Sequence, residues 1–372
     1  MARRFKDEEL NPDQRAFYEA ARAAGYTDCP DHNDPSSTGV GPTPLNNRAG
    51  VRVSTAMTYL GHARERPNLT IMPDSLAHRV VFEGRRAVGT VVETEGRTQT
   101  VFGHEIVLSS GAIGSPHLLL LSGVGPADHL RHTGIQILHD LPGVGKNLRD
   151  HPQVPLYWQT RDDFQQDEIA PPLQITLRYT AAGSPFENDM LLHPRSHAPI
   201  WTSSDPLLDL RRADPPIGFG IVDVLNLAAG SGELSLRDAD PHVQPFIDYN
   251  YLQERSDIDR LREGVHISLA LTEHPAFEGI VAERVSPSDA DLRSDGSLEE
   301  WMMREVNTSH HVSATCKMGP ASDPTAVVDQ YGRVHGLDGL RVVDASIMPD
   351  CIRANTNVTS LAIGERVADF MR

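Results

Sequence analysis

The residue types best suited to chemistry lie in three short blocks near the C-terminal end of the printed sequence. The first contains the neighbouring histidines His310 and His311, the second begins with Asp344 after an apolar run, and the third contains Asn357. A neutral histidine can accept a proton, and an amide can donate a hydrogen bond to an oxygen that gains negative charge. These types suit a flavin site that oxidises alcohols, whereas the alternative is that the histidines only pack and hydrogen-bond in a core.

A strand, a turn of small residues and a helix follow one another in the first half of the chain. The run 104–110 predicts the strand, Gly111–Pro116 the turn, and the residues from His117 onward the helix. Small residues let the backbone approach a ligand, and the first N–H groups of a helix can bind an anion. This order is typical of a nucleotide-binding α/β layer, although tight packing of a helix on a strand needs the same residues.

The segments before this turn combine a helix, a loop and short strands. Asn11 and Pro12 predict the start of a helix, because Asn caps helices and Pro favours their first position. Asp28–Asn47 is rich in Pro, Gly and Asn and predicts a long irregular loop. Further elements are expected downstream of it: a helix over 52–60, a strand over 69–72, and a hairpin formed by 77–82 and 87–93.

The middle of the chain has a different pattern. Residues from about Pro152 to Glu283 contain short runs of mixed apolar and polar residues between turns rich in Pro and Asp. Such alternation is typical of an antiparallel sheet with one covered face. Within this region, Ser256–Leu271 repeats apolar residues every three or four positions and predicts an amphipathic helix. We expect the region to form a separate substrate-binding domain.

Composition and charge argue against several classes of protein. The 372 residues carry 51 acidic and 34 basic side chains and a formal net charge of -17, so binding to nucleic acid or to an anionic membrane is not expected. Cys29, Cys316 and Cys351 lie far apart without metal-ligand spacing, so no metal site is predicted. No run approaches the ~18 apolar residues of a membrane span, and the first residues lack a signal-peptide core, so a cytoplasmic location is expected.

Several motifs resemble those of one known family. Gly111–Gly125 reads GAIGSPHLLLLSGVG and resembles a signature of the glucose-methanol-choline (GMC) oxidoreductases. The resemblance extends to Gly143–His151, to Leu234–Leu252 and to the three C-terminal blocks, and it is nearest to the bacterial choline-dehydrogenase-like branch. It implies an α/β plus α+β fold, in which an incomplete Rossmann-like FAD-binding domain accompanies a substrate domain built on an antiparallel sheet.

The resemblance also selects individual positions. The family pattern H-x-x-G-T-x-x-M-G falls on His311, with Ala314 where Gly is usual, and a second active-site position, His or Asn in this family, falls on Asn357. Neighbouring residues on a strand point to opposite faces, so only one of His310 and His311 is expected to face the flavin, and the pattern selects His311. Contacts to FAD are implied for a further set: Ala77 at the adenine, Asp344 and Ala345 at the ribityl chain and phosphate, and Val358 and Thr359 at the ring.

The implied reaction is hydride transfer from a primary or secondary alcohol to flavin N5. By resemblance, His311 would accept the hydroxyl proton, and Asn357 would donate a hydrogen bond to the developing alkoxide. A small-molecule alcohol is therefore the expected substrate. The implied domains are 1–150 for the first part of the FAD-binding domain, 151–318 for the substrate-binding domain, and 319–372 for the C-terminal part of the FAD-binding domain.

One family feature is absent from the 372 residues. They contain no G-x-G-x-x-G turn, which in such folds holds the pyrophosphate of FAD. The chain is therefore expected to begin partway through the family pattern, either as a truncated product or as one part of an enzyme whose N-terminal segment is a second polypeptide. The alternatives are a redox-inactive binding protein of the same family and a lyase that acts on cyanohydrins. A serine hydrolase is not expected, because no G-x-S-x-G elbow occurs.

Overall fold

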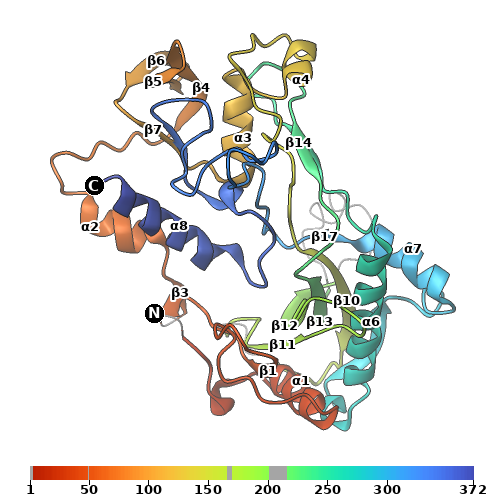
Figure 1. Cartoon of the computed structure of the whole chain (residues 1–372). Helices are drawn as coiled ribbons and strands as arrows, with labels where there is room; N and C mark the ends of the chain where they lie inside the picture. The colour runs from red at the N-terminus through yellow and green to blue at the C-terminus, as the bar shows by residue number, and fades with distance from the viewer. Residues whose placement is uncertain (1–2, 49, 166–169, 201–215) are drawn as a thin grey trace. The chain divides into compact units, whose positions relative to one another are not determined.

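The computed structural model of the chain describes residues 3–48, 50–165, 170–200 and 216–372 (Figure 1). The chain divides into two compact units, each assembled from separated stretches of sequence. Unit 1 contains Met1–Thr70, Pro152–Leu227 and Leu252–Ser309. Unit 2 contains Ile71–His151, Ala228–Tyr251 and His310–Arg372.

Unit 1 is built on a seven-stranded antiparallel sheet with the order β1-β11-β12-β13-β10-β16, in which β17 also pairs with β10. Alternate residues of β10 are buried, including Val154, Leu156 and Trp158, as expected for a strand with one face on a core. The strands are β1 (Gly39–Pro42), β10 (Pro152–Thr160), β11 (Ile175–Tyr179), β12 (Met190–Pro199), β13 (Ile217–Leu225), β16 (Val281–Ser286) and β17 (Asn307–Thr308).

Helices pack against the sheet of unit 1. The long helix α6 (Arg255–Thr272) lies along β13 and buries Leu261 and Val265 (Figure 1). The N-terminal helix α1 (Pro12–Ala23) packs against β12 and buries Phe17. The remaining short elements of this unit are η1 (Asp7–Glu9), β2 (Asn47–Arg48), β3 (Val51–Arg52), η2 (Ala56–Leu60), α2 (Gly61–Ala63), η3 (Pro275–Phe277) and α7 (Asp295–Glu305).

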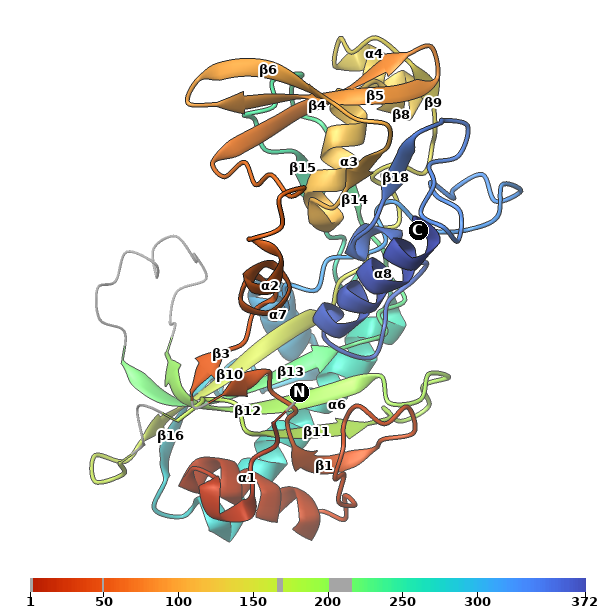
Figure 2. The same cartoon turned by 90° about the vertical axis from the view of Figure 1, so that its left-hand side faces the viewer.

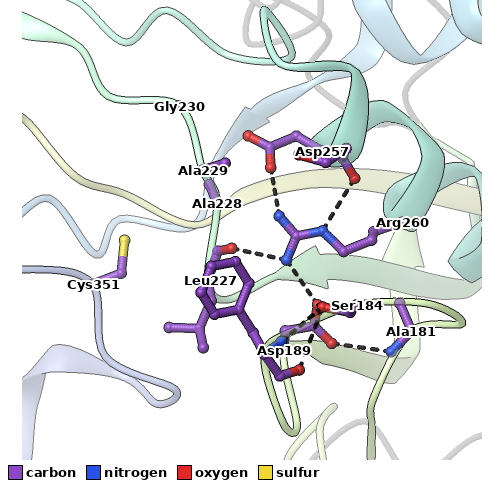
Figure 3. Close-up of polar contacts among 12 residues, drawn as sticks. Ala181, Ser184, Asp189, Leu227, Ala228, Ala229, Gly230, Asp257, Arg260 and Cys351 are labelled. Carbon is purple, nitrogen blue, oxygen red and sulfur yellow. Dashed lines mark hydrogen bonds and ion pairs between the residues drawn. The ribbon is translucent and has the colours of Figure 1, made fainter.

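A buried ionic network connects α6 to the sheet of unit 1 (Figure 3). The guanidinium of Arg260 donates hydrogen bonds to Asp257 at 2.5 Å and to Asp189 at 2.7 Å. It also donates to the carbonyl oxygen of Leu227 at 2.9 Å, and Asp189 accepts a further bond from the Ser184 hydroxyl at 2.6 Å. Because each buried charge has an opposite charge and further hydrogen bonds, its desolvation is compensated.

Unit 2 contains a pair of parallel strands and the helix α3. Strands β7 (Ile106–Leu108) and β18 (Leu340–Val342) pair in parallel, and α3 (Gly111–Leu121) begins directly after β7. Helix α3 also packs against the antiparallel sheet β4-β5-β6, which Figure 2 shows beside it. The strands of that sheet are β4 (Ser75–Glu83), β5 (Arg86–Thr94) and β6 (Arg97–Phe102).

The core of unit 2 is apolar and draws residues from all three of its sequence stretches. Leu119 and Leu120 of α3 are buried in it, together with Leu234 and Val342. The other elements are β8 (Val124–Gly125), α4 (Ala127–His132), β9 (His139–Asp140), β14 (Glu233–Ser235), β15 (Phe246–Asp248), η4 (Ala345–Ile347) and α8 (Thr356–Phe370). Within the described residues, no helix of either unit has both the length and the apolar character that crossing a membrane requires.

Most of the predicted elements are present. The combination of a parallel pair with a separate antiparallel sheet confirms the predicted fold class. The helices expected at Asn11 and over 256–271 correspond to α1 and α6, and the hairpin expected over 77–93 corresponds to β4 and β5. These elements were predictable because their periodicity and turn residues are local in sequence.

Four details of the prediction are wrong. Residues 69–72 are irregular rather than a strand, and α3 begins at Gly111 rather than at His117. The loop predicted over Asp28–Asn47 contains β1, whose small residues pair with β11. Residues 310–312 are irregular, and His310 has a left-handed φ of 61°, so the paired histidines do not lie on a strand. For β1, backbone pairing with a strand distant in sequence outweighs the local pattern of turn residues.

The unit boundaries differ from the predicted domain boundaries. Residues 1–70 belong to unit 1, because β1 pairs with β11 of the middle region. Residues 228–251 belong to unit 2, where the backbones of Leu148 and Gly232 exchange two hydrogen bonds of 2.9 Å. Both stretches join their unit through backbone pairing between residues distant in sequence.

Candidate active site

His311 lies in unit 2 beside the loop that contains Asp150 and His151. The backbones of Ser313 and Arg149 exchange two hydrogen bonds of 2.8 and 3.0 Å, which hold the two segments together. One carboxylate oxygen of Asp150 accepts hydrogen bonds from the backbone N–H of His151 at 2.8 Å and of His311 at 2.9 Å. A single carboxylate therefore fixes the backbones of both histidines.

The rings of His151 and His311 contact each other, with their Nδ1 atoms 3.0 Å apart. The Nε2 of His151 lies 2.8 Å from the carbonyl oxygen of Ile352, which can only accept, so this nitrogen carries the proton. Neutral His151 then offers a lone pair at Nδ1, to which Nδ1–H of His311 donates. The remaining nitrogen of His311, Nε2, is left as an acceptor, and it lies 2.9 Å from Nδ2 of Asn355.

Burial keeps both histidines neutral at pH 7. It lowers the pKa of His151 to about 3, and the neighbouring His311 adds to the lowering. Burial also lowers the pKa of His311, although the carboxylate of Asp150 acts in the opposite direction. A neutral histidine whose Nε2 lone pair can accept a proton has the properties of a general base.

An asparagine contacts His311, and it is Asn355. This residue precedes the first residue of α8, and its amide is exposed. Asn357, the position selected from the sequence, is exposed in the first turn of α8. The Asn-x-Asn spacing was the signal that could have drawn attention to Asn355, but Asn before a helix is also a common cap.

Two of the C-terminal blocks run side by side. The N–H of Ala314 donates to the carbonyl oxygen of Ala345 at 3.1 Å, and the N–H of Cys316 donates to that of Ser346 at 2.8 Å. This pairing brings the segment that follows His311 next to the predicted FAD contact Ala345. Ala314 itself has a left-handed φ of 68°, which explains why Gly suits this position in the family pattern.

The carboxylate of Asp344 organises the first helical turn of α3. Its Oδ2 accepts from the N–H of Gly111 at 3.0 Å and from the hydroxyl of Ser115 at 2.5 Å. Its Oδ1 accepts from the N–H and the hydroxyl of Ser346 at 2.8 and 2.5 Å. Four donors occupy the four acceptor positions of a carboxylate, so Asp344 holds this turn in place.

The other predicted FAD contacts occupy separate surfaces of unit 2. Ala77 lies on β4 and packs, half-buried, against the apolar core. Val358 and Thr359 lie in the first turns of α8, where Val358 is 70% exposed and Thr359 is half-buried. Their roles toward a cofactor stay predictions.

The residues at the ends of β7 and β18 fit part of an FAD site. Both strands are parallel and are followed by Gly111 and Asp344, and cofactors of open α/β sheets bind at this edge. Gly111 has a φ of 79°, and a Cβ built on it would meet open space. A ligand can therefore approach the backbone of this turn closely.

Comparisons with known proteins decide the family. Two models described as GMC oxidoreductase match residues 2–153 and 228–364. An oxygen-dependent choline dehydrogenase from Burkholderia pseudomallei is 34% identical over 385 residues, which cover 98% of this chain and 67% of that protein. The chain belongs to the GMC oxidoreductase family. Membership confirms the family predicted from the motifs, and it supports FAD as the cofactor and alcohol oxidoreductase as the class of enzyme.

Other relatives agree with this assignment. An oxygen-dependent choline dehydrogenase from Photobacterium profundum is 32% identical over 379 residues, which cover 98% of this GMC chain and 66% of that protein. The crystal structure of pyridoxine 4-oxidase from Mesorbium loti has a TM-score of 0.88 and 30% identity, with 98% of this chain and 70% of that chain covered. A formate oxidase with 23% identity and a TM-score of 0.84 shares the fold. The chain spans about two thirds of the length of these relatives.

Three residues of this site were not selected from the sequence. Asp150 and His151 end the block Gly143–His151, which resembles the family, but spacing did not indicate that they contact His311. Asn355 was passed over in favour of the residue two positions later. All three act through contacts with a residue that lies 44 to 161 positions away.

Proposed function

We propose that this chain carries the catalytic residues of an FAD-dependent alcohol oxidoreductase, with His311 as the general base. The observation that carries the proposal is the hydrogen-bond chain from the carbonyl of Ile352 through His151 to His311. It leaves Nε2 of His311 as the basic atom, and the lowered pKa keeps this atom unprotonated at pH 7. A general base of this kind contributes roughly 10²–10⁴ in rate.

The amide of Asn355 is the proposed partner of the substrate oxygen. In the structure it occupies Nε2 of His311, which is the atom that a substrate hydroxyl would need. An alcohol that donates its O–H to Nε2 would replace this contact, and the released amide could donate to the alcohol oxygen. A positioned donor to a developing oxyanion is worth about 10²–10³ in rate. Asn357, selected by the resemblance, is the second candidate for this role.

FAD is the cofactor of the proposed reaction, and when bound it supplies N5 as the hydride acceptor. Unit 2 is the proposed FAD-binding part, and unit 1, with its antiparallel sheet, is the proposed substrate-binding part. The turn at Gly111 would approach the cofactor with its backbone, since the carboxylate of Asp344 already accepts four hydrogen bonds. The proposed FAD-binding residues are Ala77, Gly111, Ala345, Val358 and Thr359, and Asp344 would contribute indirectly by holding Gly111 in place.

The pyrophosphate of FAD needs a turn that these 372 residues do not contain. They lack the G-x-G-x-x-G pattern whose helix N-terminus binds the pyrophosphate in Rossmann-like folds. We therefore place this turn outside the 372 residues, in a segment that belongs either to a longer form of the same protein or to a second polypeptide. The chain and this segment together would form the FAD site.

The proposed function is tested by co-expressing the chain with the N-terminal segment of a GMC relative. The purified protein is examined for flavin absorbance and then mixed with choline or pyridoxine without oxygen. We choose these two alcohols because they appear in the names of two relatives, the choline dehydrogenase and the pyridoxine 4-oxidase. We expect the flavin absorbance to be bleached, and we expect His311→Gln to slow bleaching by about 10²–10⁴ while flavin binding persists.

The matched control is His104→Gln, which changes an exposed histidine of unit 2 and should leave the bleaching rate unchanged. Two other results would support the alternatives. Bound flavin that no alcohol bleaches would indicate a redox-inactive binding protein. Cleavage of a cyanohydrin without bleaching would indicate a lyase.

A further inference from the structure

Apart from the catalytic residues, unit 2 brings His78, Glu93 and His242 together. The Nε2 of His78 lies 2.9 Å from Oε2 of Glu93, and the Nε2 of His242 lies 3.1 Å from the same oxygen. One ligand atom of each side chain lies within 4.8 Å of the others, and the two imidazole rings meet edge to face. Three side chains that are common metal ligands therefore converge on one point.

A β-bulge directs His78 into this cluster. Ala77 of β4 pairs with Val92 of β5. The next pair joins Arg79 to Val91, so His78 is an extra residue without a partner on β5. An extra residue of this kind bends the strand and redirects its side chain. The bulge places the imidazole of His78 beside the carboxylate of Glu93 near the end of β5.

The Nε2 of His78 lacks a satisfactory partner. It is buried from solvent, and among the described residues no group forms a hydrogen bond with it. The carboxylate of Glu93 lies only 2.9 Å away, but this contact is not a hydrogen bond, so the nitrogen stays unsatisfied. A buried polar atom without a hydrogen bond costs about 1–3 kcal/mol, and a bound cation would use the lone pair of this nitrogen. This atom is thus an independent indication of a ligand.

His242 reaches the cluster from the loop between β14 and β15. The carboxylate of Asp240 accepts from the N–H of His242 at 2.9 Å, and that of Asp238 accepts from the N–H of Asp240 at 3.0 Å. These turns fix the backbone before the ligand is bound. The side chain of His242 is 56% exposed and that of Glu93 is 23% exposed, so an ion could enter from solvent.

We propose that His78, Glu93 and His242 bind a divalent transition-metal ion, with Zn²⁺ as the ion that this set suits best. Two imidazoles and one carboxylate favour Zn²⁺ and its neighbours over Mg²⁺ or Ca²⁺, which prefer oxygen ligands. Bonds of ~2.0–2.1 Å at tetrahedral angles separate ligand atoms by about 3.3 Å. The observed 2.9 and 3.1 Å are close to this value, so little rearrangement is needed.

The site would connect elements that are distant in the sequence. His78 and Glu93 belong to the β4-β5-β6 sheet, whereas His242 belongs to the β14–β15 loop. Three protein ligands leave the fourth position to water, because His242 faces solvent. The ion would hold this loop on the sheet independently of the flavin chemistry, which uses other residues.

The proposal is tested by titrating the full chain, purified without a histidine tag and treated with a chelator, with Zn²⁺ in a calorimeter. We expect about one ion to bind per chain, and we expect His242→Ala and Glu93→Gln each to weaken binding at least ~10-fold. Co²⁺ should give the intense visible absorption of a four-coordinate site in the wild-type chain and not in the variants. Zn²⁺ should also raise the unfolding temperature of the wild-type chain but not that of His242→Ala or Glu93→Gln.

The control is His104→Ala, which removes an exposed histidine of the same unit outside the cluster. Its Zn²⁺ affinity should equal that of the wild-type chain. His242 is exposed, so its replacement should leave the circular dichroism spectrum unchanged, and Glu93→Gln provides a second variant of similar shape. Equal Zn²⁺ binding by wild type and His242→Ala, or no binding by wild type, would overturn the proposal.

Discussion

At the residue scale, His151 determines which nitrogen of His311 can accept a proton. Its Nε2 donates to the carbonyl of Ile352, so its Nδ1 can only accept, and His311 must place its own proton at Nδ1. Asp150 contributes by holding both backbones. His151 has no direct role in accepting the substrate proton and is therefore a positioning residue.

We predict that His151→Ala lowers the rate of alcohol oxidation by about 10-fold or more, because His311 loses the acceptor that fixes its tautomer. In the wild-type enzyme, the rate should fall as pH drops below the lowered pKa of His311, because the base becomes protonated. In the variant, water can enter the space left by the imidazole of residue 151 and hydrate His311, which should raise the pKa of His311. The pH at which the rate falls should therefore be higher than in the wild-type enzyme. Partial rescue by His151→Gln, whose amide oxygen can accept, is expected in pH–rate profiles. An unshifted acid limb in His151→Ala would contradict this role.

Ala314 provides a second prediction at this scale, because it is buried with a φ of 68°. A left-handed conformation costs an L-residue ~1–2 kcal/mol. Ala314→Gly removes this cost but loses a buried methyl group, worth ~0.8 kcal/mol, and adds backbone entropy to the unfolded chain. We expect its free energy of unfolding to lie within about 1 kcal/mol of wild type.

Ala314→Val should lower the free energy of unfolding by about 2–4 kcal/mol in urea, because a β-branched residue is strained and overpacked there. Equal stability of the two variants would contradict this account.

At the element scale, single buried ionic side chains hold separate pieces of backbone together. In unit 2, Asp344 joins the end of β18 to the first turn of α3. In unit 1, Arg260 joins α6 to the residues beside β12 and after β13 (Figure 3). Neither role could be recognised from sequence spacing, because the partners of each side chain come from different stretches of the chain.

We predict that Asp344→Ala lowers the free energy of unfolding by about 3 kcal/mol or more, because it leaves the half-buried N–H of Gly111 and the buried donors of Ser115 and Ser346 without an acceptor. Ser115→Ala removes one donor to Asp344 and the acceptor of the Ser110 N–H, so it should cost less, about 1–2 kcal/mol. Urea unfolding measures both. If the two variants lost equal stability, Asp344 would not be the centre of this turn.

A parallel prediction concerns Arg260 in unit 1. Arg260→Ala leaves the carboxylates of Asp189 and Asp257 buried without their cation, so we expect a loss of about 3–5 kcal/mol in thermal or urea unfolding. The matched control is Arg255→Ala on the same helix. Arg255 pairs with Asp259 and Glu299 in solvent, so its removal should change stability little. Similar losses in both variants would show that burial does not decide the effect.

At the scale of the whole molecule, the buried histidines of unit 2 respond to acid in one direction, whereas unit 1 carries buried groups that respond in both directions. In unit 2, burial lowers the pKa of both His151 and His311. In unit 1, burial lowers the pKa of His32 to about 4, but it also raises the pKa of Asp13 and raises that of Asp223 well above its usual value. Between pH 6.5 and 4, the histidines bind more protons in the unfolded state, whereas the buried carboxyl groups bind more in the folded state.

We therefore predict that acid loosens unit 2 before unit 1. As pH falls from 7.5 to 5, His151 alone should remove about 2 kcal/mol from the stability of unit 2, because its folded pKa lies below its unfolded value of ~6.5. In unit 1, protonation of the buried carboxyl groups adds stability as the pH falls, and this gain offsets the stability lost through His32. Hydrogen–deuterium exchange of the chain at both pH values, corrected for intrinsic rates, should show protection lost mainly in unit 2. His151→Asn should reduce this loss, and earlier loosening of unit 1 would contradict the prediction.

Local patterns in the sequence were sufficient for much of the fold. Helix α6, the β4–β5 hairpin and the antiparallel middle region follow from periodicity and turn residues, which act between near neighbours. Motifs such as Gly111–Gly125 were sufficient for the family, which the comparisons confirm. His311 was selected in the same way, and its role as the base stays a prediction.

The tertiary structure alone decided which side chains meet. It placed His151 and Asn355 on His311, gave Asp344 four donors, and assembled His78, Glu93 and His242. In the structure, residues 1–70 belong to unit 1, because β1 pairs with β11. These contacts depend on how strands pair and where a bulge redirects a side chain. Both are set by packing between segments far apart in the chain, which local composition and spacing do not encode.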